Sequence, residues 1–347
     1  MKIPIYEKDY LIQELPQFTL DLIHKSGLPW LNSLPFCTGY GAHPANRIWL
    51  KMDNDKIYDA VFYRLIRLFP FNVIEVVGFP NCTERDIIVL SKKHNAHIIL
   101  VNRLENAIKS DEEWHANQYN VFHHSYVTIV ALPATKEEYL TQLGKNKRKQ
   151  LPQWCRRMYR YFDDDLDIRF DKKADIRLED IIQLEHLNKE RRGNKGKGVD
   201  SDAAIQERQT RIFPLAQAYG MLMTIRHKGE IIGGNLNYIH GNKAYMLITG
   251  HNAALEELRI GNVAIWKTME YLIDNGINEC NFLWGRKFYK TQFLGIEYPW
   301  SVHILSPYRT LAAIWKYKLS FHAFYSRVMG FLKGRIGFYS NIKMPHL

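Results

Sequence analysis

Apolar and polar positions form two similar series of segments, one in each half of the chain. In the first half, alternating apolar residues flank a polar turn at residues 53–56, and a strand, a helical period and another strand follow. The predicted segments are two hairpin strands, a third strand, a helix and a fourth strand, at residues 47–52, 57–65, 71–77, 83–95 and 97–102. This half is therefore predicted to have the order β-β-β-α-β.

The second half of the chain repeats this order. A hairpin turns at residues 228–230, and a third strand, a helix and a fourth strand follow it. The predicted segments lie at residues 222–227, 231–240, 243–249, 262–274 and 279–283. Two copies of one supersecondary unit are the simplest explanation, so we expect an α/β (α+β) fold with mixed β-sheets.

The helix of the second copy begins at a glycine. Gly261 precedes apolar residues that recur at helical spacing, and Arg259 adds a cation just before it. A helix N-terminus carries unpaired backbone N–H groups and a partial positive charge, and a glycine there lets the backbone approach a phosphate closely. The alternative interpretation is that Gly261 and Asn262 only turn the chain and cap the helix.

The chain carries an excess of positive charge, with a formal net charge of +11. Such an excess attracts nucleic acid, anionic lipid or phosphate-bearing substrates without selecting among them. Basic residues cluster in two runs, at residues 145–160 and 189–198, and the first run contains no acidic residue. If the runs converge, they form a cationic rim for a phosphorylated ligand; the alternative is a solvated helix face or loop for each.

Composition limits the class of protein. With 46% hydrophobic and 24% charged residues, the chain is expected to fold around one large or two medium cores. Its four cysteines are far apart in sequence and show no metal-ligand spacing, so neither a zinc site nor a disulfide framework is expected. The first residues lack the apolar segment of a signal peptide, and a cytoplasmic location is expected.

Four segments of the second half resemble a known family. They are KNKRKQLPQWCRRMYR at residues 145–160, LEHLNKERRGNKGKG at 184–198, KGEIIGGNLNYIHGNKAYMLITGHN at 228–252 and IGNVAIWKTMEYLIDNGINECNFLWGRKFYK at 260–290. In this order and spacing, residues 139–299 resemble the CelD-like acetyltransferases of cellulose and exopolysaccharide biosynthesis, a branch of the GNAT superfamily. The Fem-type peptidoglycan aminoacyltransferases are a more distant match, and they share a tandem arrangement of two such domains.

The resemblance implies tandem GNAT-like acyltransferase domains. A degenerate N-terminal domain is expected over residues 1–135, an acyltransferase domain over 136–306, and a basic, aromatic tail over 307–347. No basic residue precedes the helix of the first copy, and Glu84 would repel an anion there. The first half is therefore expected to be a scaffold and acceptor wall, with a surface loop at residues 103–120.

The resemblance also implies a donor site at the helix start of the second copy, for acetyl-coenzyme A or another acyl-coenzyme A. The expected donor-binding residues are consecutive: Arg259, Ile260, Gly261, Asn262 and Val263. The superfamily usually has two glycines in this turn, whereas this chain has a single glycine there, Gly261. The donor is therefore expected to be coenzyme A held by a reduced loop, or a different activated acyl group such as an aminoacyl-tRNA.

Acyl transfer needs a base, a donor to the oxyanion and an acid for the leaving group. By resemblance, Tyr289 is placed as the acid and Lys290 beside it holds a phosphate or the oxyanion. His251 ends the third strand and is the first choice of base, because imidazole titrates near neutral pH. The alternatives are a core tyrosine and a packed or surface histidine.

The acceptor is expected to be bound by residues of the basic runs and of the helix between them. The expected acceptor-side residues, of which Glu185 and His186 are also alternative bases, are Arg148, Glu185, His186, Arg191 and Arg286. The tail from residue 308 interleaves aromatic and basic residues, a pattern typical of a helix packed on its own domain or of a membrane-surface anchor.

The resemblance implies an acyl-coenzyme A-dependent N- or O-acyltransferase that acts on a sugar or a cell-envelope or exopolysaccharide precursor. Contact with the inner-membrane surface is a further expectation from the tail. One alternative is a Fem-type transferase that uses aminoacyl-tRNA, whose phosphates the basic runs would bind. The other is a non-catalytic, membrane-associated accessory subunit of a polysaccharide synthase.

Overall fold

The computed structural model describes residues 6–17, 19, 23, 45–53, 56–78, 84–104, 119–163, 165–194 and 201–336. The chain divides into two compact units. Unit 1 comprises Met1–Val127 and Tyr298–Phe324, and unit 2 comprises Thr128–Glu297 and Tyr325–Leu347. Within the described residues, no helix combines the length and the apolar character needed to cross a membrane.

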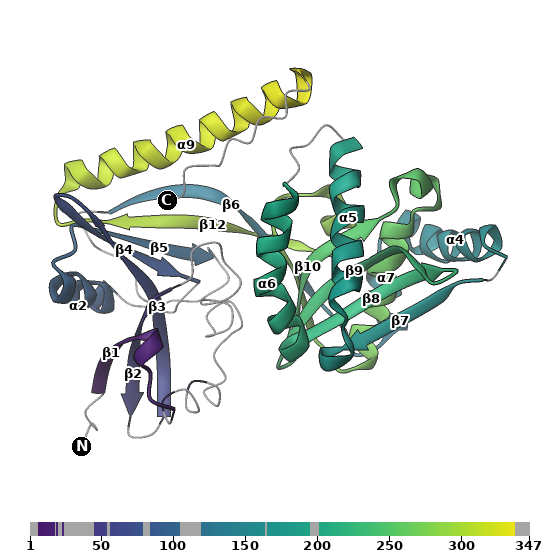
Figure 1. Cartoon of the computed structure of the whole chain (residues 1–347), viewed down its shortest axis with the longest axis horizontal. Helices are drawn as coiled ribbons and strands as arrows, with labels where there is room; N and C mark the ends of the chain where they lie inside the picture. The colour runs from purple at the N-terminus through teal and green to yellow at the C-terminus, as the bar shows by residue number, and fades with distance from the viewer. Residues whose placement is uncertain are drawn as a thin grey trace. The chain divides into compact units, whose positions relative to one another are not determined.

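Unit 1 is built around a mainly antiparallel sheet (Figure 1). Its described elements are β1 (Tyr6–Leu11), η1 (Ile12–Glu14), β2 (Arg47–Asp53), β3 (Lys56–Leu68), β4 (Phe71–Val77), α2 (Glu84–His94), β5 (Ile98–Leu104), the first part of β6 (Tyr119–Ala131), most of β12 (Ile296–Leu305) and the start of α9 (Arg309–Ile336). The strand order is β1-β2-β3-β4-β5-β12-β6, and β4 pairs with β5 in parallel.

Alternating side chains of unit 1 face two different helices. Ile74 packs in one buried cluster with Ile87 and other residues of α2, whereas its neighbour Val73 packs in another cluster with Trp315 of α9. Successive residues of a strand point to opposite faces of the sheet. Helices α2 and α9 therefore cover opposite faces of this sheet (Figure 1).

The strands of unit 2 follow one another in the order β6-β11-β10-β9-β8-β7. Its elements are the end of β6, α3 (Lys136–Gln142), α4 (Lys145–Tyr161), β7 (Asp167–Lys172), η4 (Lys173–Asp175), α5 (Leu178–Asn194), α6 (Asp202–Tyr219), β8 (Gly220–His227), β9 (Glu230–His240), β10 (Lys243–His251), η5 (Ala253–Leu258), α7 (Ile260–Asp274), β11 (Glu279–Trp284) and α8 (Phe288–Gln292). Strands β7 to β10 are antiparallel, and β10 pairs with β11 in parallel.

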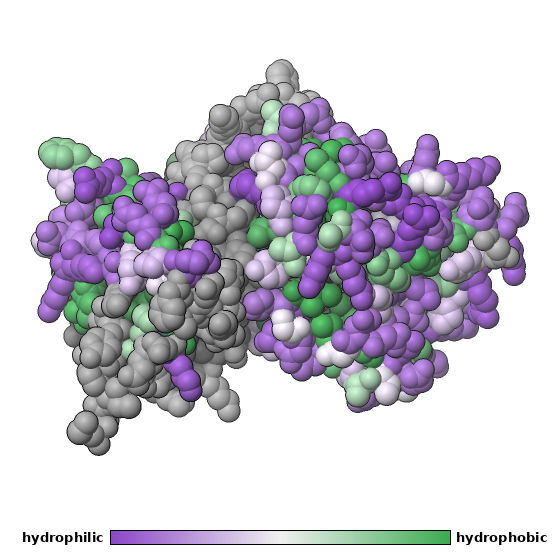
Figure 2. Space-filling view, turned by 60° about the horizontal axis from the view of Figure 1, so that its bottom comes forward, coloured by the Kyte–Doolittle hydropathy of each residue, from purple (hydrophilic) through white to green (hydrophobic). Residues whose placement is uncertain are grey.

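Helices α5 and α7 cover opposite faces of the unit 2 sheet. The evidence lies in two neighbouring residues of β10: Gly250 lies against Leu184 of α5, and His251 lies against Gly261 of α7. Strands β8 and β9 are consequently buried along most of their length. The outer surface of unit 2 seen in Figure 2 is mainly hydrophilic.

Both predicted β-β-β-α-β series are confirmed, as β2-β3-β4-α2-β5 and β8-β9-β10-α7-β11. The fold is therefore mixed α/β, with one supersecondary unit used twice. Residues 103 and 104, predicted as the start of a surface loop, instead extend β5, because Arg103 and Leu104 pair with Ser301 and Trp300 of β12. Likewise, residues 119 and 120 begin β6, and the rest of the predicted loop lies outside the described residues.

Candidate functional site

The two parallel strands of unit 2 pair over only part of their length. Pairing of β10 with β11 runs from Lys243 to Tyr245, whereas β10 continues to His251. On its other edge, β10 pairs with β9 as far as His251, with a register shift between Met246 and Ile248. A bulge of this kind bends a strand and re-aims its side chains. The last residues of β10 therefore have no pairing with β11, and His251 at the end of the strand lies against the start of α7.

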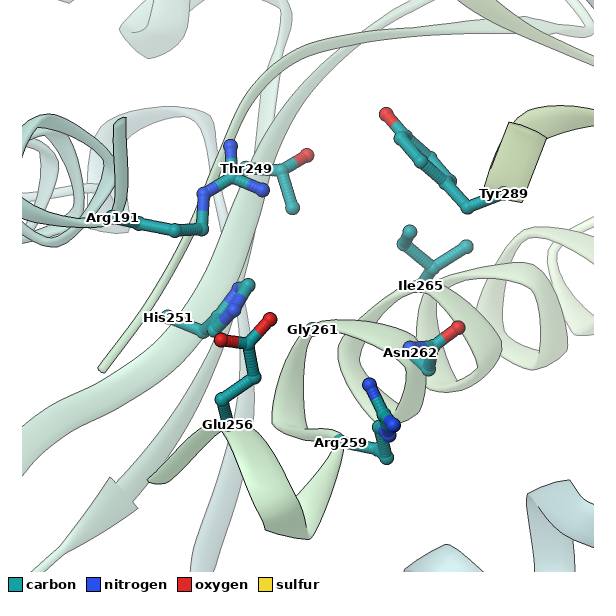
Figure 3. Close-up of a pocket in the computed structure, with 9 residues that line it drawn as sticks. All are labelled: Arg191, Thr249, His251, Glu256, Arg259, Gly261, Asn262, Ile265 and Tyr289. Atoms are coloured by element: carbon teal, nitrogen blue, oxygen red, sulfur yellow. The ribbon is translucent and has the colours of Figure 1, made fainter. Parts of the chain in front are cut away.

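A cavity of about 210 Å³ lies at this point (Figure 3). Helix α5, the end of β10, η5, the first turns of α7, and α8 all contribute to its wall. The lining residues are Arg191, Thr249, His251, Glu256, Arg259, Gly261, Asn262, Ile265 and Tyr289. The predicted donor turn, the predicted acid and the predicted base therefore line one cavity.

A glycine is required at position 261 because the ring of His251 lies against it. A Cβ atom placed on Gly261 would lie 2.7 Å from Nδ1 of His251, closer than a non-bonded contact allows. Any other residue at position 261 would therefore displace the imidazole ring or the helix start. The group that approaches the glycine in this structure is the ring of His251, whereas the predicted approach was that of a phosphate.

Arg191 enters the cavity from the last turns of α5. Its Nη2 donates a hydrogen bond of 2.9 Å to Oδ1 of Asn188, and its buried Nε has no hydrogen-bond partner among the described residues. Burial lowers the pKa of Arg191, yet a guanidinium keeps its proton at physiological pH. The side chain points into the cavity in Figure 3 and supplies a partly buried positive charge with a donor to spare.

Tyr289 faces the cavity from α8, and its hydroxyl group is directed towards the space beside Thr249 (Figure 3). Burial raises the pKa of Tyr289, and the positive charge of Arg191 offsets part of that effect. Its ring packs edge-on against Phe282, at 6.1 Å between centroids. A tyrosine held neutral in this way is a hydrogen-bond donor, which suits it to stabilise an oxyanion or to protonate a leaving group.

The start of α7 is joined to the basic helix α4. Nζ of Lys147 donates a hydrogen bond of 2.6 Å to Oδ1 of Asn262, and it lies over the rings of Trp154 and Phe293 at 4.9 and 4.3 Å. Burial, reinforced by the charge of Arg259, lowers the pKa of Lys147 to about 8. Because an ammonium group can only donate, Oδ1 of Asn262 faces Lys147 and its amide N–H groups face the other way.

Lys290, a predicted catalytic residue, does not line the cavity. Its Nζ donates to the backbone oxygens of Phe282, Leu283 and Trp284, at 2.8, 3.2 and 2.7 Å. These bonds use the three donors of the ammonium group. Lys290 therefore holds the end of β11, and burial lowers its pKa to about 8.

Four predicted acceptor-side residues also lie away from the cavity lining. Arg148 is exposed, His186 is exposed on α5, and Arg286 forms an ion pair with Glu297 at 2.6 Å. Glu185 is buried and accepts hydrogen bonds from Arg208 and Gln209 of α6. Among the predicted donor residues, Ile260 and Val263 are fully buried in the core. Of the predicted acceptor-side residues, Arg191 is the one that lines the cavity.

Three lining residues were not predicted, and Lys147 was predicted only as one member of the first basic run. Thr249 shares the strand face of His251, two residues away, and Ile265 lies one helical turn after Gly261, so spacing could have found both. Glu256 lies in η5, where no pattern marks it. Lys147 shares the buried face of α4 with Leu151 and Met158, and a charged residue at an apolar position of a helix is the signal for it.

The two predicted basic runs both reach the site. Helix α4 and helix α5 each contact η5, the segment before α7. Lys147 approaches α7 from α4, and Arg191 enters the cavity from α5. Residues 195–198 of the second run lie outside the described residues. Within the described part of the chain, no group of histidine, cysteine and acidic side chains is arranged to hold a metal ion.

Residues 146–291 match the sequence model of the acetyltransferase (GNAT) domain family. The cavity and the elements that line it all fall within this stretch. This stretch is a GNAT-type acetyltransferase domain, and a domain of this type indicates an acyltransferase. No curated protein matches the sequence.

Solved structures resemble the chain over most of its length. FemX is similar with a TM-score of 0.60 at 9% identity, over 85% of this chain and 96% of that chain. L-PGS from Bacillus licheniformis is similar with a TM-score of 0.52 at 12% identity, over 86% of this chain and 94% of that chain. A conserved protein of unknown function from Bacteroides thetaiotaomicron is similar with a TM-score of 0.51 at 11% identity, over 75% of this chain and 86% of that chain. At these identities the likeness shows the fold.

Proposed function

We propose that unit 2 transfers an acyl group from an acyl-coenzyme A to an amino or hydroxyl group of a sugar, in the assembly of a cell-envelope or exopolysaccharide precursor. One observation carries the proposal: the first turn of α7, Arg191 and Tyr289 face the same cavity within a GNAT-type domain. A helix N-terminus attracts the phosphates of the donor, and the guanidinium and the tyrosine hydroxyl serve the reacting end.

The proposed reaction is an attack of the acceptor nitrogen or oxygen on the thioester carbonyl carbon. A new C–N or C–O bond forms, the C–S bond breaks, and the acceptor loses a proton while the thiolate gains one. His251 is positioned to take the acceptor's proton, and Tyr289 is positioned to give one to the thiolate. Arg191, whose Nε has no hydrogen-bond partner within the described part of the chain, stabilises the negative charge that develops on the carbonyl oxygen.

A second candidate changes only the donor. The ring of His251 occupies the side of Gly261 on which a side chain would lie, so a pyrophosphate can reach this glycine only from its other side unless the ring moves. The fold is also similar to that of FemX, with a TM-score of 0.60. Both observations favour an aminoacyl-tRNA donor, whose phosphates the exposed basic residues of α4 would bind.

Calorimetric titration separates the two donors. Acetyl-coenzyme A and a longer acyl-coenzyme A are titrated into the wild type, Gly261→Trp and the control Gly144→Trp, a glycine around which a side chain meets no neighbouring atom. The coenzyme A proposal expects micromolar affinity in the wild type and the control, and a loss of about tenfold or more in Gly261→Trp. Such a result places the donor at the start of α7.

Absence of binding to both thioesters overturns the coenzyme A proposal. The tRNA candidate then requires an affinity for aminoacyl-tRNA that falls steeply with salt concentration. If Tyr289→Phe and Gly261→Trp both support growth as well as the wild type in a deletion strain, neither transferase proposal stands, and a non-catalytic accessory role is favoured.

A further inference from the structure

Helix α9 has a buried face that packs on unit 1. Ala312, Trp315 and Leu319 are buried, and they form one apolar cluster with residues of the underlying strands, among them Ile304 of β12. The spacing of three and four residues places them on one stripe of the helix. This stripe accounts for why the helix docks on the sheet (Figure 1).

The opposite side of α9 is apolar as well, and it is exposed. Ile314, Tyr317, Phe321 and Phe324 follow one another at spacings of three, four and three residues, so they form a second stripe, here called the outer stripe. Tyr317 and Phe321 are 76% and 69% exposed. Single exposed apolar residues are ordinary, whereas a continuous exposed stripe marks an interaction surface.

The charges of α9 are all of one sign. The helix contains Arg and Lys residues but no acidic residue over its whole length from Arg309 to Ile336. At about 100° per residue, Lys316 and Lys318 fall on the two flanks of the helix, between the outer stripe and the buried stripe. Both are exposed. Apolar aromatic residues between lysines suit a surface that offers hydrocarbon in its interior and negative charge at its rim.

A second exposed apolar group lies beside the start of α9. The turn between β3 and β4 carries Phe69, which is fully exposed, next to Leu68. Phe71 contacts the ring of His97 at 5.6 Å, and His97 stacks on Tyr308 at 6.3 Å, immediately before the helix begins. This chain of rings joins the turn to the start of α9 within unit 1, and Figure 1 shows the turn between β3 and β4 at that end of the helix.

We propose that the outer stripe of α9 binds the surface of a membrane that contains anionic phospholipid. The aromatic side chains enter the boundary between headgroups and acyl chains, and Lys316 and Lys318 contact lipid phosphates. A second copy of this chain is a poorer partner, because pairing two outer stripes brings four lysines together without a compensating acid. The inference does not depend on the identity of the acyl donor.

Vesicle sedimentation with the full chain tests this inference. Vesicles of phosphatidylcholine alone are compared with vesicles that also contain phosphatidylglycerol, at low and at high salt. The wild type is expected to bind the anionic vesicles and to lose affinity with salt. In the double variant Tyr317→Ser/Phe321→Ser, the partition coefficient is expected to fall by about tenfold or more, because two aromatic side chains no longer enter the lipid.

Matched controls separate the outer stripe from other surfaces. Phe288→Ser removes an aromatic residue that is 80% exposed on α8, and it should bind vesicles as the wild type does. Lys316→Glu/Lys318→Glu should weaken binding by about tenfold or more, whereas Lys145→Glu/Lys149→Glu on α4 makes the same charge change and should have little effect. Circular dichroism confirms that each variant is folded.

Three results overturn the proposal. They are an absence of wild-type binding to anionic vesicles at low salt, unchanged binding by Tyr317→Ser/Phe321→Ser, and equal losses in the α4 and α9 charge variants. A monomer–dimer equilibrium that Tyr317→Ser/Phe321→Ser abolishes, without any vesicle binding, would assign the outer stripe to a second copy of the chain. Analytical ultracentrifugation measures that equilibrium.

Discussion

The two β-β-β-α-β series share a topology and differ in the charge at the start of their helix. In both, the parallel strands pair over three rows, from Val73 to Glu75 and from Lys243 to Tyr245. In both, a lysine beside a tryptophan reaches a polar residue in the first described turn of the helix. In unit 1, Lys51 pairs with the carboxylate of Asp86; in unit 2, Lys147 bonds to the neutral amide of Asn262.

This difference changes the electrostatic potential at the two helix starts. An aspartate neutralises both the lysine and the positive helix start, whereas an asparagine leaves the two positive charges in place. The polar groups of unit 1 also satisfy one another: Asp9 is bonded to Arg47, Tyr63 and His94. In unit 2, the Nε of Arg191 faces a cavity and has no hydrogen-bond partner among the residues that the structure describes. The same topology therefore carries a self-satisfied polar cluster in unit 1, and in unit 2 it leaves positive charge at the cavity where we propose that the donor binds.

The largest expected effect comes from breaking the polar cluster of unit 1. In Asp9→Ala, Arg47 and Lys93 lose their carboxylate partner and Tyr63 loses an acceptor, so the free energy of unfolding should fall by about 3 kcal/mol. Urea unfolding near neutral pH measures the change. Asp274→Ala breaks the exposed pair with Lys136 and should cost about 0.5 kcal/mol or less.

The stability difference between the wild type and Asp9→Ala should depend on pH in a defined direction. Burial alone would raise the pKa of Asp9, but the hydrogen bonds and charges of Tyr63, Arg47 and Lys93 outweigh burial and lower it. The carboxylate thus stabilises the fold above the pKa of an unfolded aspartate, and that contribution is lost as the pH falls through the folded pKa. The gap between wild type and Asp9→Ala should narrow in acid. A gap that widens in acid contradicts this account of the cluster.

The next effect tests the helix start directly. Asn262→Asp gives unit 2 the carboxylate that unit 1 has, so Lys147 is neutralised and an anionic donor should bind roughly tenfold more weakly at low salt. High salt should reduce the difference. The control Asp86→Asn makes the reverse exchange in unit 1 and should leave donor affinity unchanged. Equal donor affinities for wild type and Asn262→Asp would remove the link between this residue and donor binding.

The order of elements could be predicted because hydrophobic period and turn residues are local signals. The predicted helix over residues 262–274 is α7 from Ile260 to Asp274, and the hairpin through residues 228–230 joins β8 to β9. The glycine in the first turn of α7 was also recognisable from the sequence, and so was the histidine at the end of β10. That the two lie in contact, with Gly261 against Nδ1 of His251, follows from the pairing of strands and could not be read from spacing.

The roles of the lysines could not be predicted, because they depend on contacts between distant segments. Lys290 is next to Tyr289 in sequence, yet it turns away from the cavity to three carbonyl groups at the end of β11. Lys147 stood in a run of basic residues, and 115 positions separate it from Asn262. Periodicity shows which face of a helix a residue occupies, and tertiary packing decides what that face meets.

The smallest effect sharpens the comparison by removing the lysine of unit 2. Burial lowers the pKa of Lys147 to about 8, below about 10.4 for an unfolded lysine, so the folded state holds this proton less tightly. Between these pH values the unfolded chain binds more protons, and wild-type stability rises with pH. Lys147→Met removes the buried charge and should stabilise unit 2 by about 1 kcal/mol near neutral pH, after the lost bond to Asn262 is counted.

That gain should be complete below about pH 8 and should disappear as the pH approaches about 10.4, since the wild-type lysine is then neutral in both states. Urea unfolding of both proteins across this range measures it. Lys290→Met is the matched control, because its lysine has the same lowered pKa but holds three carbonyl groups. The free energy of unfolding of Lys290→Met should be lower than that of the wild type by about 1–3 kcal/mol. A destabilised Lys147→Met would mean that Lys147, like Lys290, is retained for the fold and not for the charge at the start of α7.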